Sequence, residues 1–476
     1  MNTGNLQIRN AKLIDGKGGP LQEGATIVIR NGTIDEIGEG INVEGIPPLD
    51  VDGAYVLPGL IDSHVHLMWG PGAVIQNYEP STEQNWKQGW GQYYPHYLKA
   101  YLACGVTTIL DVGSPSYVIH EVRQHLADGR PGPDYLTLGP FLAPPNGYGN
   151  FFNHNPASPE EVEEQLSIIQ SLNTHGLKIS IEKGWSVLGG SYPMHTSSVL
   201  QAIKKGANKR NLPIYVHATC EEDQMTALKL GVHALAHTLI SRKEKLSDGF
   251  IQLMKTGASY QMSTLTTMDA ELTYFYTERL NDSLLELVAP ELELSSAKKR
   301  LKRQLAYTML MNYGLPRSPM VEGPLMRFFQ NYPGLSTKLF LWMAKLFNGK
   351  RHQENALDNS KDAIFRLHNA GVPIVMGSDA AYTPSSLYAF HGISSLREIE
   401  LLGEAGLKPQ DALRAATRTP AQMLGLSHET GTVEVNKKAD LAIIRENPLV
   451  DLSALRSIQW TVKNGIARRP EEWMAQ

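Results

Sequence analysis

The chain has 476 residues, of which 42% are hydrophobic and 19% charged, and its formal net charge at pH 7 is −4. This composition is typical of a globular protein with a sizeable core and lacks the basic surplus of a nucleic-acid-binding protein, so we expect no nucleic-acid partner. The two cysteines, Cys104 and Cys220, are far apart and have no CxxC spacing, which argues against a disulfide framework and a thiolate metal site.

The N-terminal sequence MNTGNLQIRNAKLIDGKG has no basic leader followed by an apolar segment. Uncharged apolar runs of 18 residues are also missing from the sequence. We therefore expect neither a signal peptide nor a membrane span, and a cytoplasmic location is the default.

Both ends of the chain are rich in predicted strands. Residues 5–57 contain LQIRNAKLI, ATIVIRNGTIDEIG and AYVLPG, and Asn31-Gly32 between two alternating apolar runs is a strong hairpin signal. The C-terminal residues repeat this pattern in GTVEVNKKADLAIIREN and SIQWTVKNGIARR, with a second Asn-Gly pair at Asn464-Gly465. Each end is too short for a large core, so we predict that residues 1–57 and 427–476 combine into one small β-sandwich.

Residues 58–426 alternate between strand-like and helix-like segments. Helical patterns such as PEEVEEQLSIIQSL and TSSVLQAIKKGANKR separate many of the strand-like runs. The eight strand-like runs are LIDSHVHL, GVTTILDVG, YLTLGPFLA, LKISIE, PIYVHAT, ALAHT, ASYQMSTL and PIVMGSDA. Eight strands with intervening helices predict an α/β protein with a (β/α)8 barrel, also called a TIM barrel.

A long helical insertion at about residues 266–351 interrupts this alternation between strands seven and eight. The insertion is locally basic and rich in Met, Phe and Leu. It is predicted to be a helical cap on the barrel. The alternatives are a lid over an apolar substrate pocket and, because KLFLWMAKLF has basic flanks, a contact with a membrane surface.

The first strand-like run, LIDSHVHLMW, carries ligand-capable side chains on one face. Alternation along a strand points Asp62, His64 and His66 the same way. A lone buried histidine is usually satisfied by a carbonyl or water, whereas His-x-His aims two imidazoles at one point, and imidazole is a common metal ligand. The pair alone leaves both interpretations open, so the later strands decide.

The fourth run, LKISIE, is expected to point Lys178, Ser180 and Glu182 into the barrel. A buried ammonium group needs compensation, because burial of an unpaired charge is costly. Lys178 could pair with Glu182 or Asp111. Alternatively its neutral amine, which burial favours, could react with carbon dioxide and form an anionic bridge between two metal ions.

Three further runs end in ligand-type residues. His217 ends the strand-like part of IYVHAT and His237 that of ALAHT; His233 could form a helical pair with His237, but the break at Gly231 favours His237 alone. Asp379 follows the apolar run of PIVMGSDAAY, where a helix cap is the alternative. Together, strands one, four, five, six and eight each carry such a group, and this ordered set predicts a metal site.

The sequence resembles the metal-dependent amidohydrolase superfamily, and within it the imidazolonepropionase and prolidase-like branch. The motifs that carry the resemblance are LPGLIDSHVHL, GVTTILDVG, GLKIS, VHAT, LAHT and GSDA, followed by LLGEAGLKPQDALRAATRTPAQMLGL and GTVEVNKKADLAIIRENPL. They cover almost the whole chain except the insertion. The resemblance implies a distorted barrel with a small β-sandwich built from both termini.

The resemblance also implies two divalent metal ions, expected to be zinc, and six ligands: His64, His66, Lys178, His217, His237 and Asp379. His64 and His66 would bind the more buried ion with Asp379, and His217 and His237 the second. Lys178 would be the carboxylated bridge, with Glu182 as the alternative bridge and a mononuclear site as the alternative stoichiometry. Asp379 would be the catalytic residue, accepting the proton of a metal-bound hydroxide as it attacks a carbonyl.

The substrate contacts are less well defined, because the sequence departs from its relatives there. Tyr148 in PPNGYGNFFNH stands where dipeptidase-like relatives often have a histidine, His154 is near, and Thr219 replaces a tyrosine of some relatives. We expect a hydrolase of an amide or related C–N bond in a dipeptide or N-acyl amino acid, a small-molecule or short-peptide substrate. A cyclic-amide hydrolase or deaminase, and a membrane-surface hydrolase of lipid-like amides, are the alternatives. A homo-oligomer is compatible with the sequence.

Overall fold

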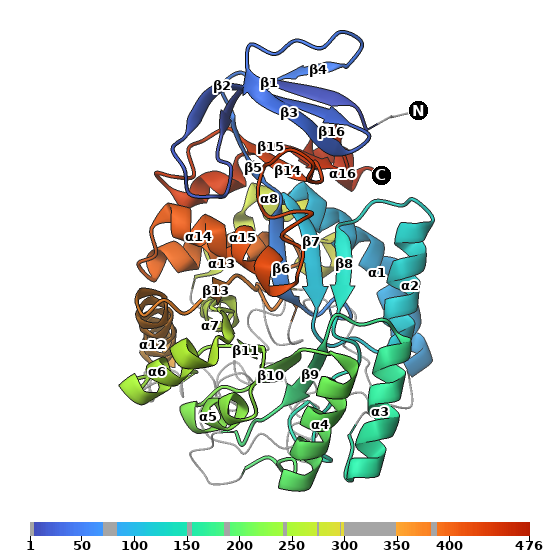
Figure 1. Ribbon diagram of the computed structural model, residues 1–476, viewed down its shortest axis with the longest axis vertical. Coiled ribbons are helices and arrows are strands. Elements are labelled where there is room, and N and C mark those ends of the chain that lie inside the picture. The colour runs from blue at the N-terminus through green and yellow to red at the C-terminus, as the bar shows by residue number, and fades with distance from the viewer. Residues whose placement is uncertain are drawn as a thin grey trace.

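The structure is a computed structural model. It describes residues 4–69, 83–149, 155–184, 191–240, 245–273, 276–295, 297–298, 349–381 and 388–476. Within these ranges a barrel of strands and helices lies below a β-sheet that combines strands from the N-terminal and C-terminal parts of the chain (Figure 1).

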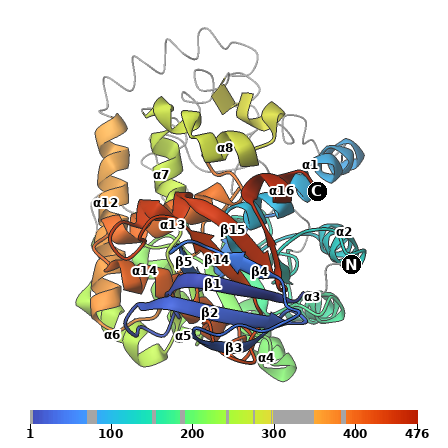
Figure 2. The same ribbon diagram turned by 90° about the horizontal axis from the view of Figure 1, so that it is seen from above.

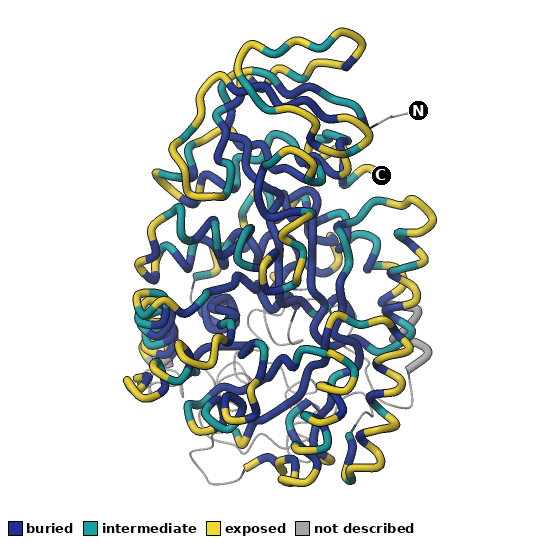
Figure 3. Tube along the Cα trace, in the orientation of Figure 1, coloured by how far each residue is buried: buried dark blue, intermediate teal, exposed yellow. Residues whose placement is uncertain are grey.

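Eight parallel strands form the barrel wall: β6 (Leu60–Val65), β7 (Val106–Asp111), β8 (Asp134–Thr137), β9 (Leu177–Ser180), β10 (Ile214–His217), β11 (Ala234–Ala236), β12 (Tyr260–Met262) and β13 (Ile374–Val375). They form two sheets, β6-β7-β8 and β9 to β13. Backbone hydrogen bonds join the sheets at both edges, from Leu142 N to Lys178 O (3.0 Å) and from Ser63 N to Met376 O (3.1 Å). These joins confirm the predicted distorted (β/α)8 barrel, whose strands are largely buried (Figure 3).

Helices surround the barrel and fill its connections: α1 (Glu83–Ala103), α2 (Ser116–Ala127), α3 (Pro159–Ser171), α4 (Ser197–Arg210), α5 (Glu221–Lys229), α6 (Asp248–Gly257), α7 (Thr266–Leu272), η2 (Thr277–Asn281), α8 (Ser283–Val288), α12 (Gly349–Asn369), α13 (Ile393–Glu404), α14 (Pro409–Ala415), α15 (Arg418–Met423), η3 (Leu452–Arg456) and α16 (Pro470–Met474). The two helices predicted from their patterns are α3 and α4. Each begins after a capping side chain, Ser158 for α3 and Thr196 for α4, that accepts a backbone N–H of the first turn.

The strands from the two ends of the chain share one eight-stranded sheet: β1 (Leu6–Leu13), β2 (Gln22–Arg30), β3 (Thr33–Glu39), β4 (Pro48–Asp50), β5 (Tyr55–Pro58), β14 (Leu441–Ile444), β15 (Ile458–Lys463) and β16 (Ile466–Arg468). Their order is β16-β15-β14-β5-β1-β2-β3, with β4 beside β1. Figure 2 shows β1, β2 and β3 side by side from above. Ile8, Ile27, Ile443 and Val462 belong to the buried core of this sheet. Only Gly59 separates β5 from β6, so the sheet lies at the amino end of the first barrel strand.

Both predicted Asn-Gly turns connect neighbouring antiparallel strands of this sheet. Asn31 and Gly32 have φ values of 51° and 78°, and Asn464 and Gly465 have 50° and 75°, as a two-residue hairpin turn requires. The run GTVEV is an exception to the predicted strands. Residues 431–435 form no strand, and Val433 N instead donates to Asp15 O (2.9 Å).

The connection between β12 and β13 contains α7, η2, α8, a helical segment at 291–295 and α12. Helix α8 packs against α1, α13 and α16. Residues 299–348, including the basic apolar stretch KLFLWMAKLF at 338–347, lie outside the described residues. In the part of the chain that is described, we find no helix long and apolar enough to cross a membrane.

Candidate metal centre

Three of the predicted ligands converge at the carboxyl ends of β6 and β13. Asp379 Oδ1 lies 3.2 Å from His64 Nε2 and 3.1 Å from His66 Nε2. One ligand atom from each residue lies within 4.8 Å of the other two, which makes the trio a candidate metal site. Two atoms that are each about 2.0–2.1 Å from a tetrahedral zinc ion are about 3.3 Å apart, so the observed spacing suits a shared ion.

The backbone brings this trio together because β6 and the segment after β13 are in close contact. Asp379 N donates to His64 O (2.7 Å), and His66 N donates to Ala380 O (2.6 Å). Gly377 makes this approach feasible, because a Cβ atom at that position would lie 2.5 Å from His64 Cβ. Asp379 has a φ of 53°, which turns its side chain out of the strand direction.

Asp62 lies behind the trio and supports it. Its carboxylate accepts hydrogen bonds from Ser378 N (3.0 Å), His64 N (3.2 Å) and Ser395 Oγ (2.6 Å). It thereby ties β6, the Asp379 segment and α13 together. This role agrees with the alternation that placed Asp62 on the same face as His64 and His66.

The protonation states of His64 and Asp379 suit cation binding. Burial, assisted by the charge of Lys178, lowers the pKa of His64 to about 3, so its imidazole is neutral at pH 7. Burial alone would raise the pKa of Asp379, but the His64 and His66 contacts hold it well below its usual range. Neutral imidazole and ionised carboxylate are the forms that coordinate metals.

His237 and His217 lie next to this trio. The His237 ring centroid is 5.1 Å from that of His64 and 4.5 Å from that of His217, and His237 Nδ1 lies 3.8 Å from Asp379 Oδ2. Burial lowers the pKa of both rings, so both are neutral at pH 7. His233 lies at the other end of β11, where its Nε2 is 2.9 Å from Met423 O.

Lys178 is buried, with 2% of its surface exposed, and its charge influences the pKa of His64, His217 and His237. Burial lowers its own pKa to about 7, so the reactive neutral amine is well populated near neutral pH. Its Nζ has no hydrogen-bond partner within the described residues. The alternative of a Lys178 ion pair with Glu182 or Asp111 is therefore not found there.

Glu182 is already committed to neighbouring groups. Its Oε2 accepts from Thr219 N (3.0 Å) and Thr219 Oγ1 (2.7 Å) and lies 3.5 Å from His217 Nε2, while its Oε1 accepts from Gly184 N (2.9 Å). Of the expected substrate contacts, Thr219 thus donates its hydroxyl proton to Glu182. Tyr148 stacks on His217, with ring centroids 4.1 Å apart and planes 13° apart, and His154 lies outside the described residues.

Sequence reasoning missed two residues that hold His237. The backbone of His237 has a φ of 70°, and its carbonyl accepts from Gln261 Nε2 (2.7 Å) and Gln224 Nε2 (3.3 Å). Both glutamines are almost fully buried. An apolar strand with one central glutamine, as in YQM, was the signal that could have identified Gln261.

The residues of the site fit a metal ion. Four buried polar atoms of the site make no hydrogen bond within the described part of the chain: His64 Nε2, Lys178 Nζ, His217 Nε2 and Asp379 Oδ1. Each unsatisfied buried group costs about 1–3 kcal/mol, and four in one small region are far above the usual frequency. A cation with nitrogen and oxygen ligands would satisfy them.

The fold and this donor set define a barrel protein with a candidate metal centre at the carboxyl ends of its strands. The model of the amidohydrolase family matches residues 55–467. The chain therefore belongs to the amidohydrolase family, whose members are typically metal-dependent hydrolases.

Individual relatives support this assignment. Dihydroorotase from Trichlorobacter lovleyi is 42% identical over 64 residues, or 13% of this chain and 15% of that protein. Imidazolonepropionase from Thermoplasma volcanium is 34% identical over 92 residues, or 19% of this chain and 21% of that protein, so the chain spans only a small part of these two relatives.

A solved structure titled as a Xaa-Pro dipeptidase with bound methionine covers 98% of this chain and 100% of its own, with a TM-score of 0.69 and 20% identity. Because the two sequences are only 20% identical, this similarity is evidence for a shared fold and not for a shared substrate. Taken together with the imidazolonepropionase match, it confirms the predicted resemblance to the imidazolonepropionase and prolidase-like branch.

Proposed function

We propose that the chain is a metal-dependent hydrolase that cleaves an amide or related C–N bond in a dipeptide or N-acyl amino acid. The observation that carries the proposal is the convergence of His64, His66 and Asp379 within 4.8 Å at the carboxyl end of the barrel. Active sites of barrel enzymes lie at this end.

In this proposal His64, His66 and Asp379 hold one divalent ion, zinc by preference. His217 and His237 would hold a second, and Lys178, as a carboxylated amine, would supply a further anionic ligand. When bound, such ions polarise a carbonyl group and lower the pKa of water. The support is the set of unsatisfied nitrogen and oxygen atoms on these residues.

Asp379 is the proton carrier of the proposal. Its carboxylate is ionised at pH 7 and faces the other ligands, so it can accept a proton from the attacking water. It then passes that proton to the leaving nitrogen, and the hydroxyl group of water ends on the carbonyl carbon. Tyr148 would contact the substrate beside His217, and the stacking of its ring on His217 supports this role.

The Xaa-Pro dipeptidase neighbour supports a dipeptide-type substrate only through its fold. A cyclic-amide hydrolase or deaminase is the second candidate. The local sequence matches to dihydroorotase and imidazolonepropionase, relatives whose names are not those of peptidases, are the observation that favours it.

A hydrolysis screen over dipeptides, N-acyl amino acids and cyclic amides tests the proposal, with the bound metal measured in the same preparations. We expect turnover of a linear amide and a new amine–carboxylate pair in the product. Release of ammonia would instead identify a deaminase, and ring opening a cyclic-amide hydrolase.

Metal dependence is tested by comparing histidines at the site with a histidine away from it. The His64→Ala/His66→Ala double variant should lose metal and activity together. His233→Ala removes an imidazole from the opposite end of β11 and should retain both. Full activity in the double variant would contradict the proposal.

A further inference from the structure

We propose that Glu398 is a positioning residue for the candidate metal centre. It fixes the loop that follows β12, and through that loop it orients His237 and the segment that carries Asp379. The inference rests on the metal-binding part of the proposed function and adds a residue from α13, outside the barrel strands.

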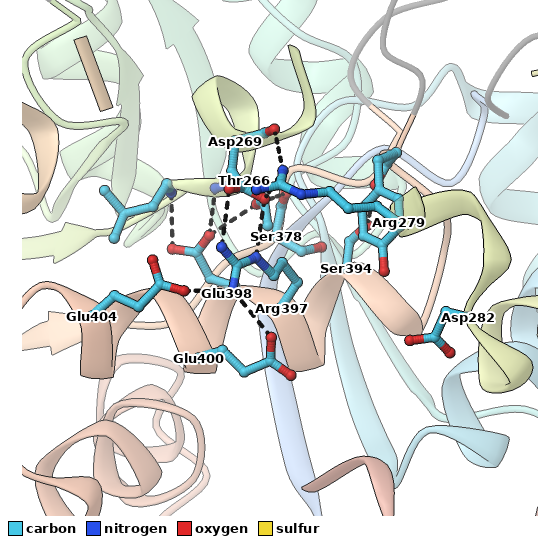
Figure 4. A network of polar contacts seen from close by, with 12 residues as sticks. Thr266, Asp269, Arg279, Asp282, Ser378, Ser394, Arg397, Glu398, Glu400 and Glu404 are labelled. Atoms are coloured by element: carbon cyan, nitrogen blue, oxygen red, sulfur yellow. Dashed lines mark hydrogen bonds and ion pairs between the residues drawn. The ribbon is translucent and has the colours of Figure 1, made fainter. Parts of the chain in front are cut away.

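Glu398 is a fully buried carboxylate that points from α13 to the loop after β12 (Figure 4). Its Oε1 accepts from Ser263 Oγ and from Leu265 N (2.9 Å). Its Oε2 accepts from Thr266 N (2.7 Å) and Thr266 Oγ1 (2.8 Å). A carboxylate has about four acceptor positions, so this one loop uses the full capacity of Glu398.

The first consequence concerns His237. Thr264 lies between the two residues that bond to Glu398 Oε1 and has a φ of 43°, a strained conformation for a β-branched residue. Its Oγ1 lies 2.9 Å from His237 Nδ1 and thus contacts the imidazole ring directly. Strained backbone persists only where its surroundings hold it, and Glu398 supplies those bonds on both sides of Thr264.

The second consequence concerns Asp379. The Thr266 hydroxyl has a single proton, which is shared between two acceptors: Glu398 Oε2 (2.8 Å) and the carbonyl oxygen of Ser378 (2.5 Å), the residue before Asp379. Glu398 therefore reaches the Asp379 segment through one hydroxyl group. The same helix holds Ser378 from its other side, since Ser395 Oγ bonds to the Asp62 carboxylate that accepts Ser378 N.

If Glu398 only stabilised the fold, we would expect it to form ion pairs like those of its neighbours on α13. Arg397, next to Glu398, is paired with Asp269 (3.0 Å), Glu400 (3.2 Å) and Glu404 (2.6 Å) (Figure 4). Within the described residues, no lysine or arginine pairs with Glu398. A carboxylate buried without a cation is costly, and here its partners are loop donors only.

The experiment compares Glu398→Gln with Glu400→Gln in the full chain. Glutamine keeps the size of Glu398 but turns an NH2 group toward one pair of donors, so the loop loses acceptors. Glu400→Gln is the matched control, because Glu400 lies on the same helix and accepts from Arg456 Nε (2.5 Å) without touching the loop. The measurements are zinc affinity by chelator competition, the visible spectrum of the Co²⁺-loaded protein, and the melting temperature without metal.

We expect both variants to melt earlier, but only Glu398→Gln to bind zinc about 10-fold or more weakly and to show shifted Co²⁺ bands. If Glu398→Gln does not fold, Thr264→Val is tested in its place. It removes the hydroxyl next to His237 and should give the same loss of zinc affinity and the same shift of the Co²⁺ bands. A variant with wild-type zinc affinity and Co²⁺ spectrum would overturn the positioning role alone. Wild-type protein that binds no divalent metal would overturn the proposed function, and this inference with it.

Discussion

Gly377→Ala is expected to displace His64 without changing any candidate ligand. A Cβ atom at position 377 would lie 2.5 Å from His64 Cβ, 3.2 Å from His64 N and 3.4 Å from His64 Cα. His64 is fully buried, and because these three atoms belong to the strand or are fixed by it, no rotamer change relieves the contact. Carbon atoms pack at about 3.5–4.0 Å, so the two segments must separate by about 1 Å.

This separation has two measurable costs. Overpacking of a tight core typically costs about 1–3 kcal/mol in the free energy of unfolding. A shift of about 1 Å in a group that positions a reaction can cost about 10²-fold in rate. Gly377 is not in the left-handed backbone region, so backbone strain adds nothing to either figure.

The assay combines chemical unfolding, bound metal per chain and kcat/KM on the best substrate of the screen. Gly91→Ala is the matched control, because Gly91 is exposed on α1 and its added Cβ meets nothing within 4 Å among the described residues. Alanine there should be neutral or stabilise the helix by up to about 1 kcal/mol. Wild-type stability and metal content in Gly377→Ala would refute the close-contact reasoning.

Three further predictions test individual groups of the site and its surroundings. Lys178→Ala removes the buried amine that has no hydrogen-bond partner among the described residues, and it should reduce metal occupancy and lower activity about 10–100-fold. Elemental analysis measures the occupancy, and an unchanged occupancy would favour Glu182 as the bridge. Asp379→Asn removes the proton carrier and should lower kcat about 10²–10⁴-fold, whereas a near-normal kcat would exclude Asp379 from proton transfer. Burial raises the pKa of Glu293 from 4.5 to about 8, so its stabilising contribution is complete below pH 4.5 and is lost as pH rises through about 8. Denaturant unfolding between pH 5 and 9 should therefore show wild type losing stability relative to Glu293→Gln, and parallel curves would contradict the raised pKa.

The sequence was informative where periodicity and order carry the information. The alternation in LIDSHVHL predicts that His64 and His66 share a face, and the order of strand ends predicts which residues lie near them. The Asn-Gly pairs predict the two hairpin turns, because few other residue pairs adopt positive φ twice in succession. These signals predict the fold class and a set of ligand-type groups at the strand ends, whereas the grouping of Asp379 with His64 and His66 was implied by the family resemblance.

The supporting groups could not be found in this way, because they come from distant parts of the chain. Ser395 and Glu398 are three residues apart in ISSLREIELLGE and share a helical face, but the sequence contains several polar residues there and does not show which face is buried. Gln224 and Gln261 likewise depend on tertiary contacts with the His237 carbonyl. The run GTVEV has strand-like alternation, yet it forms no strand, and its Val433 N–H donates a hydrogen bond to the Asp15 carbonyl oxygen.

The metal dependence of the enzyme is best tested by measuring the metal content of the purified protein together with its amide hydrolysis before chelation, after chelation and after zinc is restored. We expect one or two equivalents of divalent metal, loss of hydrolysis when the metal is removed, and recovery when it returns. The His64→Ala/His66→Ala variant should show neither binding nor recovery. Full hydrolysis by thoroughly chelated, metal-free protein would contradict a metal-dependent mechanism.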